Sequence, residues 1–153
     1  IRVPDHGALK PWKLVVITGD ARARLDSEVI HAEFTAVNPD AKPEAEAVET
    51  GRLQRADVVI AVISSPVEHP TIEEWEMWLS AGAVCTTLLY AAQSFGYAAQ
   101  WLTEWYAYSD RMLTELGGRP GLDRIAGFIY IGEKIKPPIE RTRPDPEKVI
   151  ARL

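Results

Sequence analysis

The amino-acid sequence predicts an α+β domain with one long buried helix at its centre. Three β-branched and mostly apolar runs, residues 12–18, 57–63 and 124–131, predict strands that are covered on both faces. A longer stretch carries no charged residue between Glu76 and Glu104. The chain of 153 residues is long enough for one core and suits one domain.

The uncharged stretch begins as a helix that is apolar on nearly every face. Apolar side chains recur at three- and four-residue steps, and small residues such as Gly82 and Ala83 fill the faces between them. A helix that is apolar all round must be buried all round, either inside the core or at a subunit interface. Because small residues let another backbone approach, we expect this helix to pack against a partner chain as well. The recurring residues are Trp75, Trp78, Leu79, Val84, Leu88, Leu89 and Ala92.

Sequence signals mark both ends of this helix. Thr71 and Glu74 have the spacing of a capping box, and Gly96 suits a left-handed stop. Beyond the glycine, residues 97–102 predict a short buried strand. His69 precedes the helix, and we expect it to hydrogen-bond its own loop rather than to act as a base.

The remaining segments predict the elements around this helix. Residues 12–18 are expected to form a central strand, followed by a helix over 21–37. An acidic, weakly amphipathic helix over 44–55 should be broken by Gly51. A short helix should end at Leu116, because two glycines follow it.

Both ends of the chain are turn-rich or proline-rich. Residues 1–11 predict a loop or a short helix end. Residues 133–153 hold four prolines among charged residues, so they should run extended over a surface, that of a partner subunit. We therefore treat 1–153 as one domain with an extended tail.

Composition excludes several classes of function. The net charge is −5 and no long basic run occurs, which argues against nucleic acid as a partner. Polar residues interrupt the uncharged stretch and no Lys or Arg flanks it, which argues against a membrane span. Cys85 is the only cysteine, so we expect a small core residue and a cytoplasmic location.

No motif identifies a catalytic group. The sequence has no Walker loop, no dinucleotide-binding glycine fingerprint after a strand, no HExxH and no GxSxG. Metal-ligand spacing is absent, and the glutamates cluster at helix starts, so we predict neither a metal site nor a protein acid–base pair. Trp101, Trp105, Tyr106 and Tyr108 form an aromatic cluster that suits core packing or a site for flat rings.

Five segments, in this order and over nearly the whole chain, resemble the FMN-dependent nitroreductase family, nearest its small single-domain bacterial branch. They are Arg2-Val-Pro-Asp-His6 with Lys10-Pro11-Trp12; Arg55-Ala56-Asp57 with the strand VVIAVIS; HPTIEEWEMWLSAGA over residues 69–83; Leu89-Tyr-Ala-Ala92 with Gly96, Tyr97 and Trp101-Leu-Thr103; and Ala126-Gly-Phe-Ile-Tyr-Ile-Gly132 with the late Pro-Asp-Pro.

The resemblance implies a nitroreductase-like fold, with a central mixed or antiparallel sheet flanked by helices. It also implies a homodimer that binds FMN at the subunit interface. It further implies an oxidoreductase in which flavin N5 takes a hydride from NADH or NADPH and passes it to a nitroaromatic, a quinone or a similar flat acceptor. Catalysis would then rest mainly on positioning, with no essential protein acid or base.

The resemblance also carries residue roles over to this chain. Arg2 and His6 match cofactor contacts of the family's first segment. Trp101, Leu102 and Thr103 match contacts on the strand after the long helix, where backbone groups and the threonine hydroxyl can meet the ring edge. Residues 91–96 match a stretch linked to the nicotinamide nucleotide. In full, this last set is Ala91, Ala92, Gln93, Ser94, Phe95 and Gly96.

Two departures from the family pattern motivate an alternative. The family begins with a helix bearing an Arg-Ser segment that contacts the flavin, and this chain starts after it. Leu102 stands where relatives often carry Arg. The alternative is a catalytically silent family member that serves as a dimeric ligand-binding or interaction protein.

Overall fold

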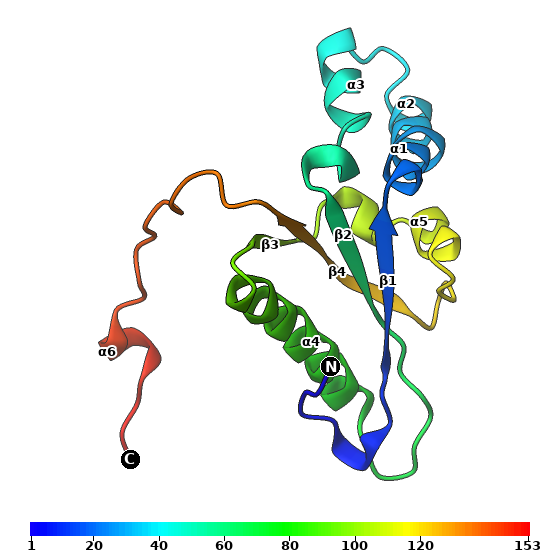
Figure 1. Ribbon diagram of the computed structural model, residues 1–153. Coiled ribbons are helices and arrows are strands. Elements are labelled where there is room, and N and C mark those ends of the chain that lie inside the picture. The colour runs from blue at the N-terminus through cyan, green and yellow to red at the C-terminus, as the bar shows by residue number, and fades with distance from the viewer.

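A computed structural model describes residues 1–153 and contains one four-stranded sheet (Figure 1). The strand order is β1-β2-β4-β3, and every neighbouring pair is antiparallel. The prediction of an α+β fold with an antiparallel sheet is confirmed. The strands are β1 (Trp12–Thr18), β2 (Val58–Ser64), β3 (Ala98–Leu102) and β4 (Arg124–Gly132).

The sheet has β1 at one edge and β3 at the other, and this differs from the sequence prediction at both strands. β1 was expected to be central, yet only β2 pairs with it, and Val16 is 63% exposed. β3 was expected to be buried, yet Trp101 is 37% exposed. An apolar run predicts that both faces of a strand are buried. It does not show whether the same chain or another chain buries them.

Helices from both halves of the chain close one face of the sheet. α1 (Asp20–Leu25) and α2 (Ala32–Val37) join through a π-helical stretch (Asp26–His31) into the single helix predicted over 21–37. α5 (Asp110–Glu115) and two short helices, Leu53–Arg55 and Trp105–Tyr108, complete this layer. Together they enclose a cluster of 16 buried residues, which is the main core.

One helix, α4 (Glu74–Ser94), crosses the opposite face of the sheet (Figure 1). Its buried side carries Met77, Ala81, Val84 and Cys85, and the fully buried cluster on this face has only four members. Its outer side leaves Leu79 54% exposed. A single chain therefore buries only one side of α4, and the predicted burial of the outer side against a partner chain stays a prediction.

The two ends of α4 follow the predicted signals only in part. Gly96 adopts φ +86°, which confirms the left-handed stop. The predicted capping box is wrong, because Glu73 occupies the N-cap and Thr71 lies outside the helix. The backbone N–H groups of Thr71 and Ile72 instead donate to His69 Nδ1, which confirms the loop-holding role of that histidine.

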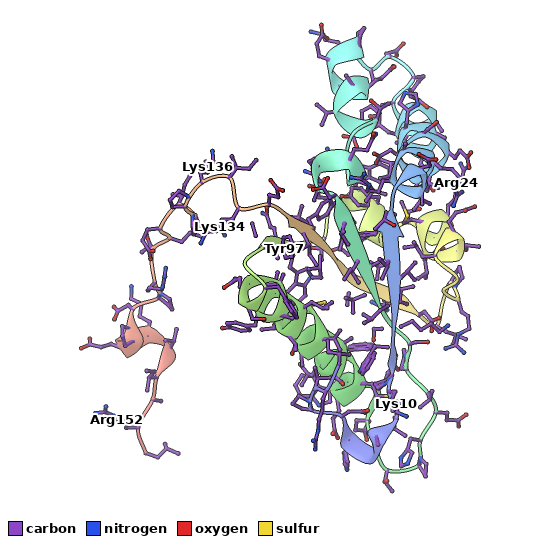
Figure 2. All side chains as sticks on the ribbon, viewed as in Figure 1. Lys10, Arg24, Tyr97, Lys134, Lys136 and Arg152 are labelled. Carbon is purple, nitrogen blue, oxygen red and sulfur yellow. The ribbon has the colours of Figure 1, made fainter.

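Three further segments lie at the margins of the fold. A short helix over His6–Ala8 precedes β1, and α3 (Pro43–Glu49) ends just before Gly51, as the predicted break requires. After β4, the chain runs away from the body to α6 (Pro146–Val149), and Figure 2 shows the side chains of Lys134 and Lys136 on this extended tail. None of the helices combines the length and the apolar composition needed to cross a lipid bilayer.

Candidate functional site

The first predicted site segment packs beside the opening turns of α4. Ser80 Oγ donates to the Pro4 carbonyl at 2.8 Å, and His6 Nδ1 lies 2.9 Å from a carboxylate oxygen of Glu76. Neither contact uses His6 Nε2. Arg2 is exposed, forms no ion pair, and lines a cavity of about 900 Å³ together with Asp5 and other residues of this segment. The segment therefore presents a free guanidinium beside an open cavity.

The second predicted segment forms the β3 edge of the sheet. Trp101 Nε1 donates to the Ala126 carbonyl at 3.0 Å, so the indole ring lies across the backbone of β4. Gly127 makes this possible, because a Cβ at that position would overlap the indole. Leu102 packs against the main core, so its side chain serves the fold. Thr103 is exposed just beyond the strand.

An edge strand has one row of backbone N–H and C=O groups without partners in its own sheet. β3 pairs only with β4, so the outer row of residues 98–102 is free within this chain. These groups can hydrogen-bond the polar rim of a flat heterocycle. The exposed hydroxyl of Thr103 adds a further donor or acceptor at the end of the row.

The two segments lie on opposite flanks of α4. Glu76, which contacts His6, and Trp78 are two residues apart, so they point about 200° apart around the helix. Trp78 lies under the guanidinium of Arg124 at 5.4 Å, so this flank faces the start of β4. β3 is the sheet edge beyond β4, whereas the Arg2 segment leads into β1 at the opposite edge. One chain therefore does not bring Arg2 and His6 together with the Trp101–Thr103 segment.

The stretch linked to the nicotinamide nucleotide lies at the far end of α4. Ala91, Ala92 and Phe95 line a cavity of about 550 Å³ with residues of β2 and β4. Gln93, Ser94 and Gly96 are exposed around the same turn, and Phe95 is 80% exposed. This cavity is apart from the Arg2 segment, which contacts the first turns of the helix.

A partly exposed network of charged residues holds the segment that follows β3. Arg52 and Arg55 both contact the carboxylate of Glu104, each at 2.8 Å, and Glu104 follows Thr103 directly. Burial alone would lower the pKa of Arg55, but its interactions with Glu104, Tyr130 and Tyr106 together more than offset this and raise the pKa. The two arginines therefore stay charged and anchor the end of β3. Sequence reasoning missed this anchor, because no local motif joins Glu104 to arginines so far away along the chain.

The aromatic cluster is divided between the core and the surface. Tyr106 is fully buried, and its hydroxyl lies 2.6 Å from that of Tyr130. Burial raises the pKa of Tyr106 well above its ordinary value, so the phenol stays protonated. Tyr108 is 76% exposed and Trp105 is 38% exposed. Core packing is thus right for Tyr106, whereas the other two rings remain available on the surface.

Neither the single thiol nor the possible metal ligands meet the requirements of a reaction centre. Burial raises the pKa of Cys85 to about 12, so this thiol is not a nucleophile at neutral pH, as expected for a core residue. No group of three or more His, Cys, Asp or Glu side chains could hold a metal ion.

Solved structures share this fold at low sequence identity. The nitroreductase-like family protein from Bacillus cereus superposes with a TM-score of 0.78 at 20% identity, over 98% of this chain and 77% of that chain. A mutant form of NfnB from sphigopyxis sp. strain HMH, described as an FMN and NADPH-dependent nitroreductase, gives a TM-score of 0.71 at 16% identity, over 99% and 83%. The fold class is therefore that of the nitroreductases.

Sequence comparison identifies the family itself. The model of the nitroreductase family matches residues 1–133. A protein of Escherichia coli K12 named "Putative NAD(P)H nitroreductase YdjA" is 30% identical over 149 residues, which cover 95% of this chain and 78% of that protein. The chain belongs to the nitroreductase family. This confirms the resemblance and the predicted class of activity, that of a flavin-dependent NAD(P)H oxidoreductase.

Proposed function

We propose that two copies of this chain bind FMN between them and catalyse reduction of a nitroaromatic, a quinone or another flat acceptor by NADH or NADPH. When bound, FMN supplies the hydride chemistry that the protein side chains lack. The curated relative is named for NAD(P)H, and NfnB is described as dependent on FMN and NADPH. The chain's own residues bind and orient the reactants. A cytoplasmic location is part of the proposal.

One observation carries the proposal: the predicted cofactor residues are divided between opposite flanks of α4. A single copy cannot wrap both sets around one ligand. A two-fold pair that meets along α4 lets Arg2 and His6 of one copy face the Trp101–Thr103 segment of the other. The site would thus be complete only in the homodimer.

The residues present fit FMN chemically. The phosphate requires a cation, and Arg2 has a guanidinium with no partner beside the cavity of about 900 Å³. His6 Nε2 offers a second polar group nearby. The ring rim requires donors and acceptors, and the unpaired outer row of β3, with the Thr103 hydroxyl, offers both. Leu102 would contribute through its backbone, because its side chain is committed to the core.

The outer side of α4 supports the homodimer. Trp75, Leu79 and Tyr90 are 59%, 54% and 69% exposed, and large apolar surfaces of this kind mark association sites. Small residues such as Gly82 between them permit close approach of a second backbone. The tail after Glu133 extends away from its own body, and we propose that it packs on the partner (Figure 1).

The nicotinamide nucleotide would bind at the C-terminal end of α4. Ala91, Ala92 and Phe95 give an apolar lining to the cavity of about 550 Å³. Gln93 and Ser94 supply polar groups at its exposed margin, and the backbone at Gly96 turns sharply beside them. No protein acid or base is assigned, since positioning of two flat reactants accounts for the activity.

A complementation experiment tests whether the site is shared between two copies. Arg2→Ala removes the phosphate cation, and Thr103→Glu places a negative charge at the ring rim; each variant alone should lose most FMN binding. In a mixed dimer, one site carries both lesions and the other is intact. Co-expressed chains with different affinity tags should therefore recover one flavin per mixed dimer, read from visible absorbance.

The absence of flavin from the mixed dimer would contradict a site shared between two copies. If both segments serve one ligand within one chain, every site in the mixed dimer carries one lesion, and no flavin returns. The matched control is Arg111→Ala, which removes an exposed arginine on α5 and should leave FMN binding unchanged.

The catalytically silent alternative is separated by turnover. The wild-type protein loaded with FMN should oxidise NADH or NADPH steadily when menadione or a nitrofuran is present. Full FMN occupancy without oxidation of either nucleotide would favour the silent ligand-binding protein instead.

A further inference from the structure

A cavity of about 490 Å³ lies on the face of the sheet opposite α4, between α2, the end of α3 and the short helix Trp105–Tyr108. Its volume falls in the range of small-molecule sites. Eight residues line it, namely Glu33, Phe34, Val37, Asn38, Glu49, Trp105, Tyr108 and Ser109. Neither the cofactor residues nor the nicotinamide residues contribute to it.

The charges of this cavity have one sign. Two lining residues are carboxylates, and no lysine or arginine lines it. Glu49 is satisfied internally: Arg52 contacts both of its oxygens, and Trp105 Nε1 donates to Oε2 at 3.0 Å. Burial alone would raise the pKa of Glu49, but these bonds more than offset it and lower the value.

Glu33 is the carboxylate left without a cation. Its only hydrogen bond comes from Ser109 Oγ, which donates to Oε2 at 2.6 Å, and it forms no salt bridge. The side chain is only partly exposed, so water screens its charge less than it would screen a surface carboxylate. A ligand cation would supply the missing partner, because charge-assisted hydrogen bonds and ion pairs strengthen with partial burial.

Three aromatic residues line the same cavity as this carboxylate. Phe34, Trp105 and Tyr108 line the cavity, and Tyr108 keeps 76% of its surface exposed. Trp105 is held by its bond to Glu49 and by an edge contact with Tyr106, with ring centroids 5.8 Å apart. Aromatic faces attract cations and also bury the apolar parts of an organic ligand. An anion would meet two carboxylates, and a neutral ligand would leave Glu33 desolvated and unpaired.

We propose that this cavity binds a small organic cation, an ammonium or similar positive group attached to a flat apolar body. Glu33 pairs with the charge, and the rings of Trp105, Tyr108 and Phe34 contact the body. The site is independent of FMN, because it lies on the other face of the sheet and uses none of the cofactor residues.

The test uses benzyltrimethylammonium as the cation, with benzyl alcohol and benzoate as neutral and anionic probes of similar size. The wild-type dimer is titrated, and the indole N–H signal of Trp105 is followed by NMR, with its assignment taken from Trp105→Phe. The cation should shift this signal with a dissociation constant of about 1 mM or tighter, while the other two probes bind much more weakly.

Two variants and a control locate the interaction. Glu33→Gln keeps the Ser109 hydrogen bond but removes the charge, and should weaken binding roughly tenfold. Tyr108→Ala removes an exposed ring and should weaken it roughly threefold. Glu44→Gln removes an exposed charge on α3, outside the cavity, and should change nothing. Equal binding of benzyl alcohol, an unmoved Trp105 signal, or equal losses in the Glu33 and Glu44 variants would overturn the proposal.

Discussion

The two faces of the sheet differ in how completely the chain covers them. On one face, helices from residues 20–55 and 105–115 enclose a cluster of 16 buried residues. On the other face, α4 alone covers a fully buried cluster of four, and Val16 and Leu79 remain mostly exposed. The first face holds most of the buried core, and the second face leaves apolar side chains that its own chain does not cover.

This difference bears on where the site can lie. Every predicted cofactor or nucleotide residue except the partly buried side chain of Leu102 lies on the open face, beside α4 or at its ends. The predicted binding residues on β3 are held in place by anchors such as Glu104 with Arg52 and Arg55. The open face can therefore expose backbone and side chains to a ligand without losing the fold.

The closed face should give the largest effect on stability. Phe128 is fully buried and packs against Tyr106, with ring centroids 5.2 Å apart. Phe128→Ala should lower the free energy of unfolding by about 3–5 kcal/mol, measured by urea denaturation at fixed protein concentration. Val16→Ala on the open face should cost less than about 0.5 kcal/mol. Similar losses for both variants would refute the contrast between the faces.

Acid should reveal the next largest effect, through Asp123. Its buried carboxylate accepts from Arg119 Nη2 at 2.7 Å and from Ser65 Oγ at 2.8 Å. Burial alone would raise the pKa of Asp123, but these bonds more than offset it and hold the pKa below its usual range. Asp123→Asn should cost about 1.5–3 kcal/mol at pH 7.

The sign of the pH dependence follows from that lowered pKa. The unfolded carboxyl titrates near pH 4, so the stabilisation is complete above that pH and is lost as pH falls through the folded pKa. Wild-type stability should therefore drop more steeply than that of Asp123→Asn between about pH 5 and pH 2. Parallel curves from urea denaturation across this range would contradict the assignment.

A smaller effect is expected where α5 closes the first face. Ser109 is the N-cap of α5, and its Oγ accepts from the backbone N–H of Met112 at 3.0 Å. Ser109→Ala should lower the free energy of unfolding by about 1 kcal/mol. Ser94→Ala is the control, because that hydroxyl only donates to a carbonyl within α4. A midpoint shift no larger than that of the control would argue against the cap.

The open face should give the smallest change in the fold of a single chain and the clearest change in assembly. Leu79→Glu places a charge on the exposed side of α4 and should leave the far-ultraviolet circular dichroism spectrum unchanged. Its mass by light scattering should fall from two chains to one, and FMN binding should fall with it. Val48→Glu, on the exposed side of α3, should do neither. A Leu79→Glu dimer with normal flavin content would exclude α4 as the interface.

The sequence was sufficient to locate the three main strands along the chain, but not their positions in the sheet. Residues 12–18, 57–63 and 124–131 were recognised as strands because their β-branched runs are unambiguous. The edge position of β1 was not predicted, because an apolar edge strand and an interior strand can have the same composition. At the start of α4, Thr71 has the right spacing for a cap, but the His69 loop takes its backbone N–H instead.

The candidate site was predictable only as a list of residues. The family resemblance pointed to Arg2 and to Trp101–Thr103, but their separation across α4 depends on tertiary packing that no local pattern encodes. The anchor of Glu104 depends on two arginines distant in sequence. The aromatic cavity beside Glu33 joins residues from three separate elements, so no sequence window contains it.

The exposure of the tail beyond β4 makes the rate of its proteolysis a measure of dimer formation. Lys134 and Arg141 lie on an extended backbone that is exposed in the lone chain, and each is followed by a bond that trypsin can cleave. If a second copy holds that backbone, the same bonds resist digestion, and the rate of cutting measures how much of the protein is paired. Limited digestion across a dilution series would thus follow pairing without any label, ligand or substitution.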